Sequence, residues 1–212
     1  MPKRRRDPVP SQAAAERFDR DYYDRYYHAP ASRVSDLAAV RTLANLVAAW
    51  LRYLDIEVRH ILDVGCGLGH WQVAARELWP RARYHGVEWS QHLCQRLGWT
   101  RGSIATLQPQ QALGRATFDL VICQGVLQYL DDRDAGKALA NLARWTDGAL
   151  FLEALTARDW RENCDRTRTD GDVRLRAGAW YRRRLRRHFQ ACGGGVFVNR
   201  RAGCTRFELE GL

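Results

Sequence analysis

The sequence has 212 residues, 46% of them hydrophobic, and a formal net charge of +10. This length suits one domain with a substantial core, and the composition is that of ordinary globular proteins. No apolar run approaches the ~20 residues of a membrane span and the first ten residues lack the apolar segment of a signal peptide, so a cytoplasmic protein without a membrane partner is expected.

The chain is expected to begin with a disordered basic leader over residues 1–14, followed by a single domain over residues 15–212. The leader carries the run KRRR and then two prolines and small residues, which is typical of unstructured termini. Residues 18–28 read FDRDYYDRYYH, in which tyrosine pairs four residues apart place aromatic surface on one side of a helix. Residues 40–54 repeat apolar residues at spacings of three and four, which predicts a long amphipathic helix against the sheet.

Residues 61–71, ILDVGCGLGHW, run from β-favouring apolar residues into alternating glycines and then a helix start. Such a strand, glycine turn and helix present backbone N–H groups to a nucleotide-like ligand. A dinucleotide site would have G-x-G-x-x-G, whereas this loop has G-x-G-x-G with Asp63 two residues before it. That acid would repel pyrophosphate but could take the ammonium of an amino-acid moiety. The alternative is a glycine turn that binds no ligand.

Residues 83–88, RYHGVE, predict a second strand that ends in an acid, and Glu88 lies 19 residues after Gly69. A carboxylate about 20 residues past a glycine loop, at the tip of the next strand, is placed to accept hydrogen bonds from both ribose hydroxyls. With both signals, the chain resembles the class I S-adenosylmethionine-dependent methyltransferases, whose first motif is an acidic residue followed by G-x-G-x-G.

The resemblance continues over residues 118–128, where FDLVIC predicts a central parallel strand and QGVLQ follows. The family's fourth motif has FDLVI, then a polar, a small and two apolar residues. Gln124 would lie at the carboxyl end of this strand, where open α/β sheets bind their ligands, and its backbone carbonyl would face the cofactor's ammonium. The resemblance runs from about residue 32 to the C-terminus and is weak outside these three stretches.

The resemblance implies an α/β doubly wound fold with a mostly parallel seven-stranded sheet, helices on both faces and a C-terminal antiparallel hairpin. It implies S-adenosylmethionine as cofactor and S-adenosylhomocysteine as product, with no metal. The acceptor is expected to be a small molecule because no separate macromolecule-binding domain is found. The expected cofactor contacts are Asp63, Gly65, Cys66, Gly67, Gly69, Glu88, Trp89, Ser103, Ile104, Gln124, Gly125 and Tyr23.

Several of these contacts are implied by the family. Residues 15–30 correspond to a segment that in many such enzymes closes as a lid over the methionine end of the cofactor, with Tyr23 or Tyr27 as the contact; a helix packed on the body is the alternative. Trp89 occupies the place of an apolar residue against the adenine, or it is a core residue. Residues 101–107 are expected to form the third strand and its loop, where many relatives have an Asp for the adenine amino group. The chain offers Ser103 beside Ile104 instead, so a hydroxyl or the backbone could substitute.

Residues 149–153 predict the fifth strand, after a helix over 135–145. Glu153 at its tip is the candidate catalytic residue, because it could orient or deprotonate a nucleophile; a solvent-facing acid is the alternative. The long charged loop over residues 156–176 is expected to shape the substrate site. If the acceptor is anionic, Arg166 or Arg168 could hold it.

Residues 178–189 predict a helix with Trp180, Leu185 and Phe189 inward and five arginines outward, which favours a solvated face over an RNA footprint. Residues 193–212 predict two strands joined by a turn around residues 201–203. Three alternatives to a small-molecule enzyme stay open: an RNA or protein methyltransferase, a non-catalytic module that binds the cofactor, and a nucleotide-dependent oxidoreductase, which the glycine spacing disfavours.

Overall fold

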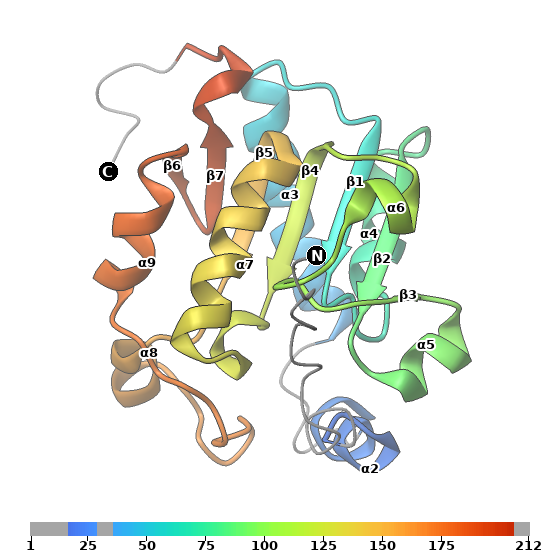
Figure 1. Ribbon diagram of the computed structural model, residues 1–212, viewed down its shortest axis with the longest axis vertical. Helices are drawn as coiled ribbons and strands as arrows, with labels where there is room; N and C mark the ends of the chain where they lie inside the picture. The colour runs from blue at the N-terminus through green and yellow to red at the C-terminus, as the bar shows by residue number, and fades with distance from the viewer. Residues whose placement is uncertain (1–16, 29–35, 206–212) are drawn as a thin grey trace, which may run out of the picture.

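The computed structural model describes residues 17–28 and 36–205, so the leader predicted for residues 1–14 lies outside the described residues. Within these ranges one sheet has the strand order β3-β2-β1-β4-β5-β7-β6 (Figure 1). Its strands are β1 (His60–Val64), β2 (Arg83–Glu88), β3 (Thr100–Arg101), β4 (Phe118–Gln124), β5 (Thr146–Glu153), β6 (Phe189–Gly193) and β7 (Val196–Asn199). The first five run parallel, and β7 is antiparallel to β5 and β6. The predicted doubly wound sheet with a C-terminal antiparallel hairpin is therefore confirmed.

Helices cover both faces of this sheet (Figure 1). The helical segments of the described residues are α2 (Arg20–Tyr23), η1 (Asp24–His28), α3 (Leu37–Tyr53), α4 (His70–Leu78), α5 (Gln91–Leu97), α6 (Pro109–Leu113), η2 (Leu127–Tyr129), α7 (Asp132–Trp145), α8 (Ala157–Glu162), α9 (Gly178–Leu185) and η3 (Arg200–Ala202). One core cluster joins α3 and α4 to one face, and another joins α7 and α9 to the opposite face. Residues 120–123 of β4 alternate between the two clusters, which is why all four of them are apolar.

The long helix predicted before the first strand is α3, and Asp36 caps its N-terminus by accepting a hydrogen bond from the Ala39 amide at 2.9 Å. Its buried residues are Val40, Ala44, Val47, Ala48 and Leu51. Small alanines therefore share the buried stripe with the larger residues. They allow the helix to lie close to α4 and the sheet.

The C-terminal hairpin lies earlier in the chain than predicted. Helix α9 ends at Leu185 instead of Phe189, and Phe189 begins β6. The turn is formed by Gly194 and Gly195, with φ of +57° and +80°, and the residues predicted to turn belong to η3 and its cap. Left-handed conformations are nearly free only for glycine, so the glycine run determines where the chain reverses. The remainder of the predicted last strand, residues 206–212, lies outside the described residues.

Two other expectations differ in detail. The third strand is short, Thr100–Arg101, so the predicted stretch of residues 101–107 is almost entirely the loop that follows it. In α9 the buried residues are Tyr181 and Leu185, whereas Trp180 is half-buried with the Arg184 guanidinium 3.6 Å from its ring centre. Among the described residues, no helix combines the length and hydrophobicity that a membrane crossing requires.

Candidate functional site

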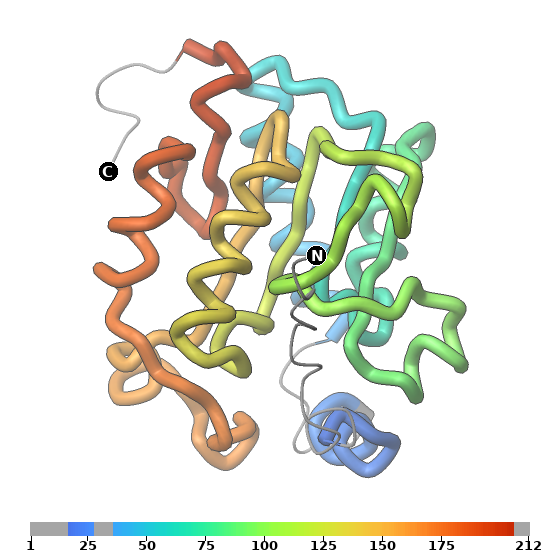
Figure 2. The backbone as a smooth tube through the Cα atoms, in the orientation of Figure 1, coloured from blue at the N-terminus to red at the C-terminus, as the bar shows by residue number. Residues whose placement is uncertain are grey.

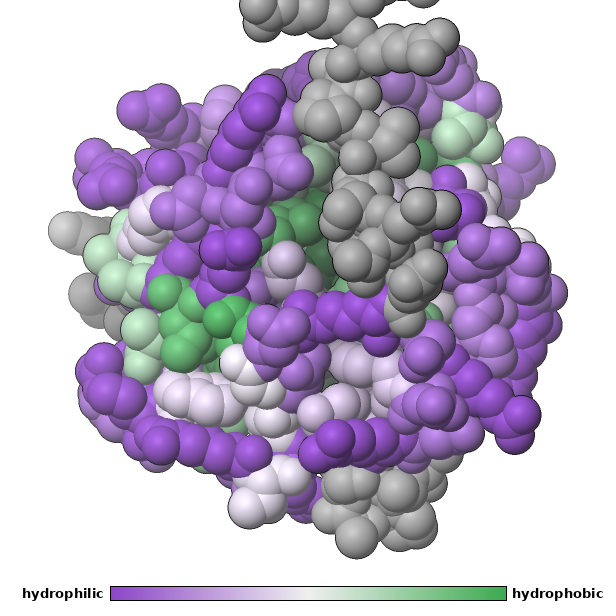
Figure 3. Space-filling view, turned by 60° about the horizontal axis from the view of Figure 1, so that its bottom comes forward, coloured by the Kyte–Doolittle hydropathy of each residue, from purple (hydrophilic) through white to green (hydrophobic). Residues whose placement is uncertain are grey.

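A cleft of about 720 Å³ lies at the carboxyl ends of β1, β4 and β5. Its walls come from the loop after β1, the loops after β4 and β5, the start of α3, and the N-terminal segment, which is defined here as residues 17–28. Figure 2 shows this segment at the same end of the molecule as the chain that follows α8. Figure 3 views that end, where hydrophilic side chains surround smaller apolar areas. The cleft is thus at the edge where parallel sheets bind ligands.

The three glycines after β1 all have positive φ but have different surroundings. A Cβ on Gly65 would lie 2.3 Å from Val126 Cγ2, and one on Gly69 would lie 2.8 Å from Trp99 Cζ2. A Cβ on Gly67 would meet nothing closer than a carbonyl oxygen at 4.0 Å. Gly65 and Gly69 therefore serve packing, while Gly67 is the position where a ligand can reach the main chain. The Trp99 indole supports it by donating to the Gly67 carbonyl at 3.0 Å.

Glu88 is 5% exposed at the tip of β2. Its Oε2 accepts from the Gly67 amide at 2.9 Å, and its Oε1 accepts from the amides of Trp89 at 2.8 Å and Ser90 at 2.9 Å. A carboxylate has about four acceptor positions, so three are used by the backbone. The acid and the glycine loop, which sequence analysis paired by spacing alone, are in direct contact.

The N-terminal segment covers the tip of β2. Ser90 Oγ donates to the Phe18 carbonyl at 2.5 Å, and Tyr23 is 5% exposed. Burial raises the pKa of Tyr23, and the nearby charge of Glu88 raises it further. Tyr23 is therefore buried beside the acid, while Tyr27 lines the cleft.

Asp63 is 2% exposed at the end of β1 and lines the cleft. The Tyr84 hydroxyl donates a hydrogen bond to its Oδ2. Burial raises the pKa of Asp63 to about 7, against the lowering effect of the Tyr84 bond, and the charge of Glu88 adds to the rise. The carboxyl group is thus poised between its neutral and charged forms near neutral pH.

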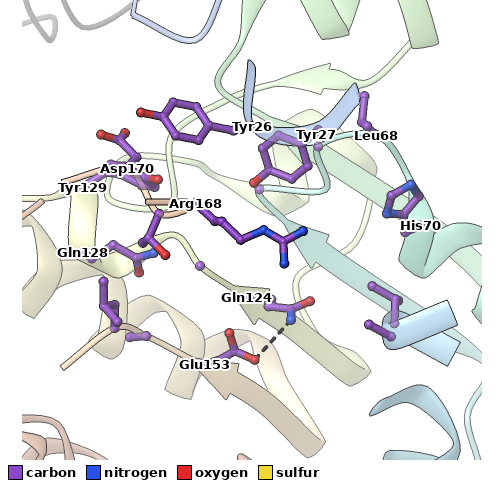
Figure 4. A pocket seen from close by; sticks show the side chains of 18 of the residues that line it. Tyr26, Tyr27, Leu68, His70, Gln124, Gln128, Tyr129, Glu153, Arg168 and Asp170 are labelled. Carbon is purple, nitrogen blue, oxygen red and sulfur yellow. Dashed lines mark hydrogen bonds between the residues drawn. The ribbon is translucent and has the colours of Figure 1, made fainter. Parts of the chain in front are cut away.

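A chain of side-chain hydrogen bonds crosses the floor of the cleft, and Figure 4 marks its link between Gln124 and Glu153. Trp71 Nε1 donates to Gln124 Oε1 at 2.7 Å, and Gln124 Nε2 donates to Glu153 Oε2 at 3.1 Å. Glu153 is solvent-exposed at the tip of β5, and partial desolvation by the cleft walls raises its pKa, although the bond from Gln124 opposes this. The Glu153 carboxylate is therefore held in a defined orientation at the tip of β5.

The N-terminal segment is also attached to the opposite wall. The hydroxyls of Tyr22 and Tyr129 are 2.9 Å apart, and Arg17 forms an ion pair with Asp170 at 2.8 Å. Phe18 packs edge-on against Tyr129 with ring centres 5.1 Å apart. Residues far apart in the sequence thus close one side of the cleft.

The structure brings most of the sequence-predicted contacts to this edge, but not all of them into the cleft. The predicted residues that line it are Asp63, Gly65, Cys66, Gly67, Gln124, Gly125 and Glu153. Gly69 packs on Trp99, while Glu88 and Trp89 lie at the tip of β2. Ile104 is buried with its carbonyl bound by Asn141 at 2.8 Å, and Ser103 accepts from the Ala105 amide at 3.2 Å.

Sequence reasoning missed the residues that orient these groups. Tyr84, Trp71, Trp99 and Tyr129 carry no motif of their own. Trp71, two residues after the last glycine, had the clearest signal, because the first helical turn after such a loop faces the site. The other three could be found only from the packing.

The sequence of the central region can be compared with known families. Residues 62–147, which include the glycine loop, Glu88 and Gln124, match the family model described as a methyltransferase domain. Over these residues the chain is similar to methyltransferase domains. A comparison with curated protein sequences gives no match.

Solved structures of several methyltransferases share the fold of this chain. DesVI from Streptomyces venezuelae has a TM-score of 0.58 and 18% identity, covering 86% of this chain and 99% of that one. Magnesium protoporphyrin IX methyltransferase (ChlM) from Synechocystis PCC 6803, with bound SAH, has a TM-score of 0.57 and 17% identity, and the match covers 88% of this chain and 96% of that one. An O-methyltransferase family protein from Burkholderia thailandensis has a TM-score of 0.54 and 15% identity, and the match covers 79% of this chain and 59% of that protein's length. At these identities the likeness shows the fold alone.

Proposed function

We propose that this protein transfers a methyl group from S-adenosylmethionine to a small-molecule acceptor by SN2 displacement. The observation that carries the proposal is the contact between Gly67 and Glu88, because it places a buried acid and an accessible stretch of main chain at one ligand edge. Glu88 would accept from a ribose hydroxyl at its remaining acceptor position, and Asp63 with the Gln124 carbonyl would bind the ammonium. Trp89, Ser103 and Ile104 would flank the adenine.

The cofactor supplies an electrophilic methyl group on a sulfonium, so the protein's task is to align the acceptor and exclude water. The N-terminal segment contributes Tyr27 to the wall and closes one side of the cleft. Glu153, held by Gln124, would orient the nucleophile or take its proton. The raised pKa of Glu153 is the direction that makes a carboxylate a stronger base.

Two observations favour a small acceptor over RNA or protein. The N-terminal segment bridges the tip of β2 and the wall around Tyr129, which limits the entry of a large chain. The exposed arginines of α9 lie on its outer surface, outside the cleft. Among the solved neighbours, the Synechocystis protein is named a magnesium protoporphyrin IX methyltransferase.

The first experiment is a calorimetric titration of the full chain with S-adenosylhomocysteine and, in parallel, NAD. Saturable binding of S-adenosylhomocysteine alone supports the proposed cofactor and permits an acceptor screen. Preferential binding of NAD would support an oxidoreductase instead. Binding without turnover on any acceptor would favour a non-catalytic module, while RNA binding with a steep salt dependence would favour the macromolecular alternative.

A further inference from the structure

Arg168 projects from the chain after α8 into the middle of the cleft, where its guanidinium lies between Tyr27 and Gln124 (Figure 4). The neighbouring Arg166 takes a different course. Its Nε donates to the Trp160 carbonyl at 3.1 Å, and its guanidinium lies 5.4 Å from the Trp160 ring centre. Of the two arginines that the sequence left as alternatives, Arg168 alone faces the site.

Three acids of the same loop, Asp159, Asp165 and Asp170, also line the cleft, and each accepts from a donor outside the cleft floor or within its own loop. Asp159 accepts from Thr156 Oγ1 at 2.5 Å, and Asp165 accepts from Thr167 Oγ1 at 2.6 Å. Asp170 is paired with Arg17, and Figure 4 shows its carboxylate at the edge of the view, away from the Arg168 guanidinium. Arg168 is the basic side chain that this loop adds to the lining of the cleft, and its charge contributes to the lowered pKa of Asp165.

We propose that Arg168 binds an anionic group of the methyl acceptor, a carboxylate or a phosphate. The inference rests on the proposed function. A guanidinium holds such groups through two parallel hydrogen bonds, which fix direction as well as position. Glu153 and Gln124 lie across the cleft from Tyr27 (Figure 4), so the anionic end of the acceptor is anchored beside the residues that orient its nucleophile.

The aromatic wall restricts the rest of the acceptor. Tyr26, Tyr27 and Tyr129 line the same cleft as Arg168. Aromatic faces give apolar contact to a flat ring. Small aromatic carboxylates and phosphates are therefore the appropriate probes.

The test uses the full chain saturated with S-adenosylhomocysteine and ligand-observed NMR titrations. The probes are two matched pairs, 4-hydroxybenzoate with 4-hydroxybenzamide, and phenyl phosphate with phenol. At least one anion is expected to bind about tenfold more tightly than its neutral partner, as charge-assisted hydrogen bonds allow. Which pair shows the difference distinguishes a carboxylate from a phosphate.

Three variants distinguish direct binding of the anion by Arg168 from a general attraction of anions to a basic protein. Arg168→Gln is expected to lose the preference for the anion, Arg168→Lys to keep part of it, and the matched control Arg166→Gln to keep it fully. The proposal is overturned if the anion and its neutral partner bind equally in both pairs, or if neither anion binds. It is also overturned if the preference for the anion persists in Arg168→Gln. Weaker binding of S-adenosylhomocysteine by Arg168→Gln also overturns it, since the guanidinium would then serve the cofactor. Failure of the wild-type chain to bind S-adenosylhomocysteine would instead refute the proposed function.

Discussion

The amide of Gly67 donates a hydrogen bond of 2.9 Å to Oε2 of Glu88. The two residues are 21 positions apart in the sequence, at the ends of neighbouring parallel strands. Their contact joins the glycine loop to the acid, so a ligand that reaches one lies beside the other. The first two predictions test these residues separately.

Glu88→Ala should weaken S-adenosylhomocysteine binding by about 1.5 to 3 kcal/mol, the usual size for hydrogen bonds to a charged group. The carboxylate would no longer bind the ribose, and the loop would lose the acceptor for the Gly67 amide. Calorimetry gives the affinity, and circular dichroism verifies the fold. Glu57→Ala is the control, because Glu57 is an exposed acid that pairs with Arg59. Unchanged affinity in a folded Glu88→Ala protein would show that the site has been misplaced.

Gly67→Ala should reduce S-adenosylhomocysteine affinity about tenfold or more, because the added methyl group overpacks the space that the ligand needs. The new Cβ meets no protein atom within 3.9 Å, so a clash with the rest of the chain is not the cause. Gly98→Ala provides the matched control: Gly98 also has positive φ, 73° against 50°, and has open space around its Cβ. Both variants carry the same kind of backbone strain. Equal affinities for the two would contradict the role of Gly67.

Asp63 predicts a pH dependence of binding. Only the ionised carboxylate attracts an ammonium, and burial raises the pKa of Asp63 to about 7. Affinity for S-adenosylhomocysteine should therefore rise several-fold from pH 6 to 7.5, and Asp63→Asn should remove this rise. Titrations at both pH values measure it. A wild-type affinity that is flat across this range would exclude Asp63 as the ammonium partner.

The same group affects stability without ligand, with the opposite sign. A carboxyl whose folded pKa is raised binds a proton more tightly when folded, so it stabilises the fold at low pH and this contribution is lost as pH rises towards 7. The free energy of unfolding of the wild type should therefore fall relative to that of the Asp63→Asn variant when the pH rises from 5 to 7.5. Urea denaturation at the two pH values measures that difference. A shift towards the wild type would be inconsistent with a raised pKa.

Arg17→Gln should loosen the N-terminal segment. It removes the ion pair with Asp170, whose carboxylate is 12% exposed, and a partly buried pair of this kind is worth about 1 kcal/mol, or about fivefold in the population of the open form. Chymotrypsin cleavage at the tyrosines of residues 22–27 should accelerate by that factor. Arg20→Gln is the control, since Arg20 lies on the same segment with an exposed partner, Asp24. Equal cleavage rates in both variants would show that Arg17 does not hold the segment.

Local patterns predicted the parts of the fold that depend on neighbouring residues. The strand His60–Val64, the glycine turn and the acid-tipped strand Arg83–Glu88 lie where they were expected, because strand propensity and glycine φ are short-range effects. The hairpin was predicted too late in the chain, because the residues after Gly195 read as the first of its two strands and not as the second. Its position depends on which segment pairs with β5, and residues 196–198 do so.

The sequence by itself determined the class of fold, the ligand edge and the acids directed to it, since motif spacing decides which strand ends meet in a parallel sheet. The tertiary structure alone decided how those acids are held and what covers them. Tyr84 on Asp63, Trp71 on Gln124 and Arg17 on Asp170 are contacts between distant segments. They form only when packing brings the segments together, and no local preference encodes them.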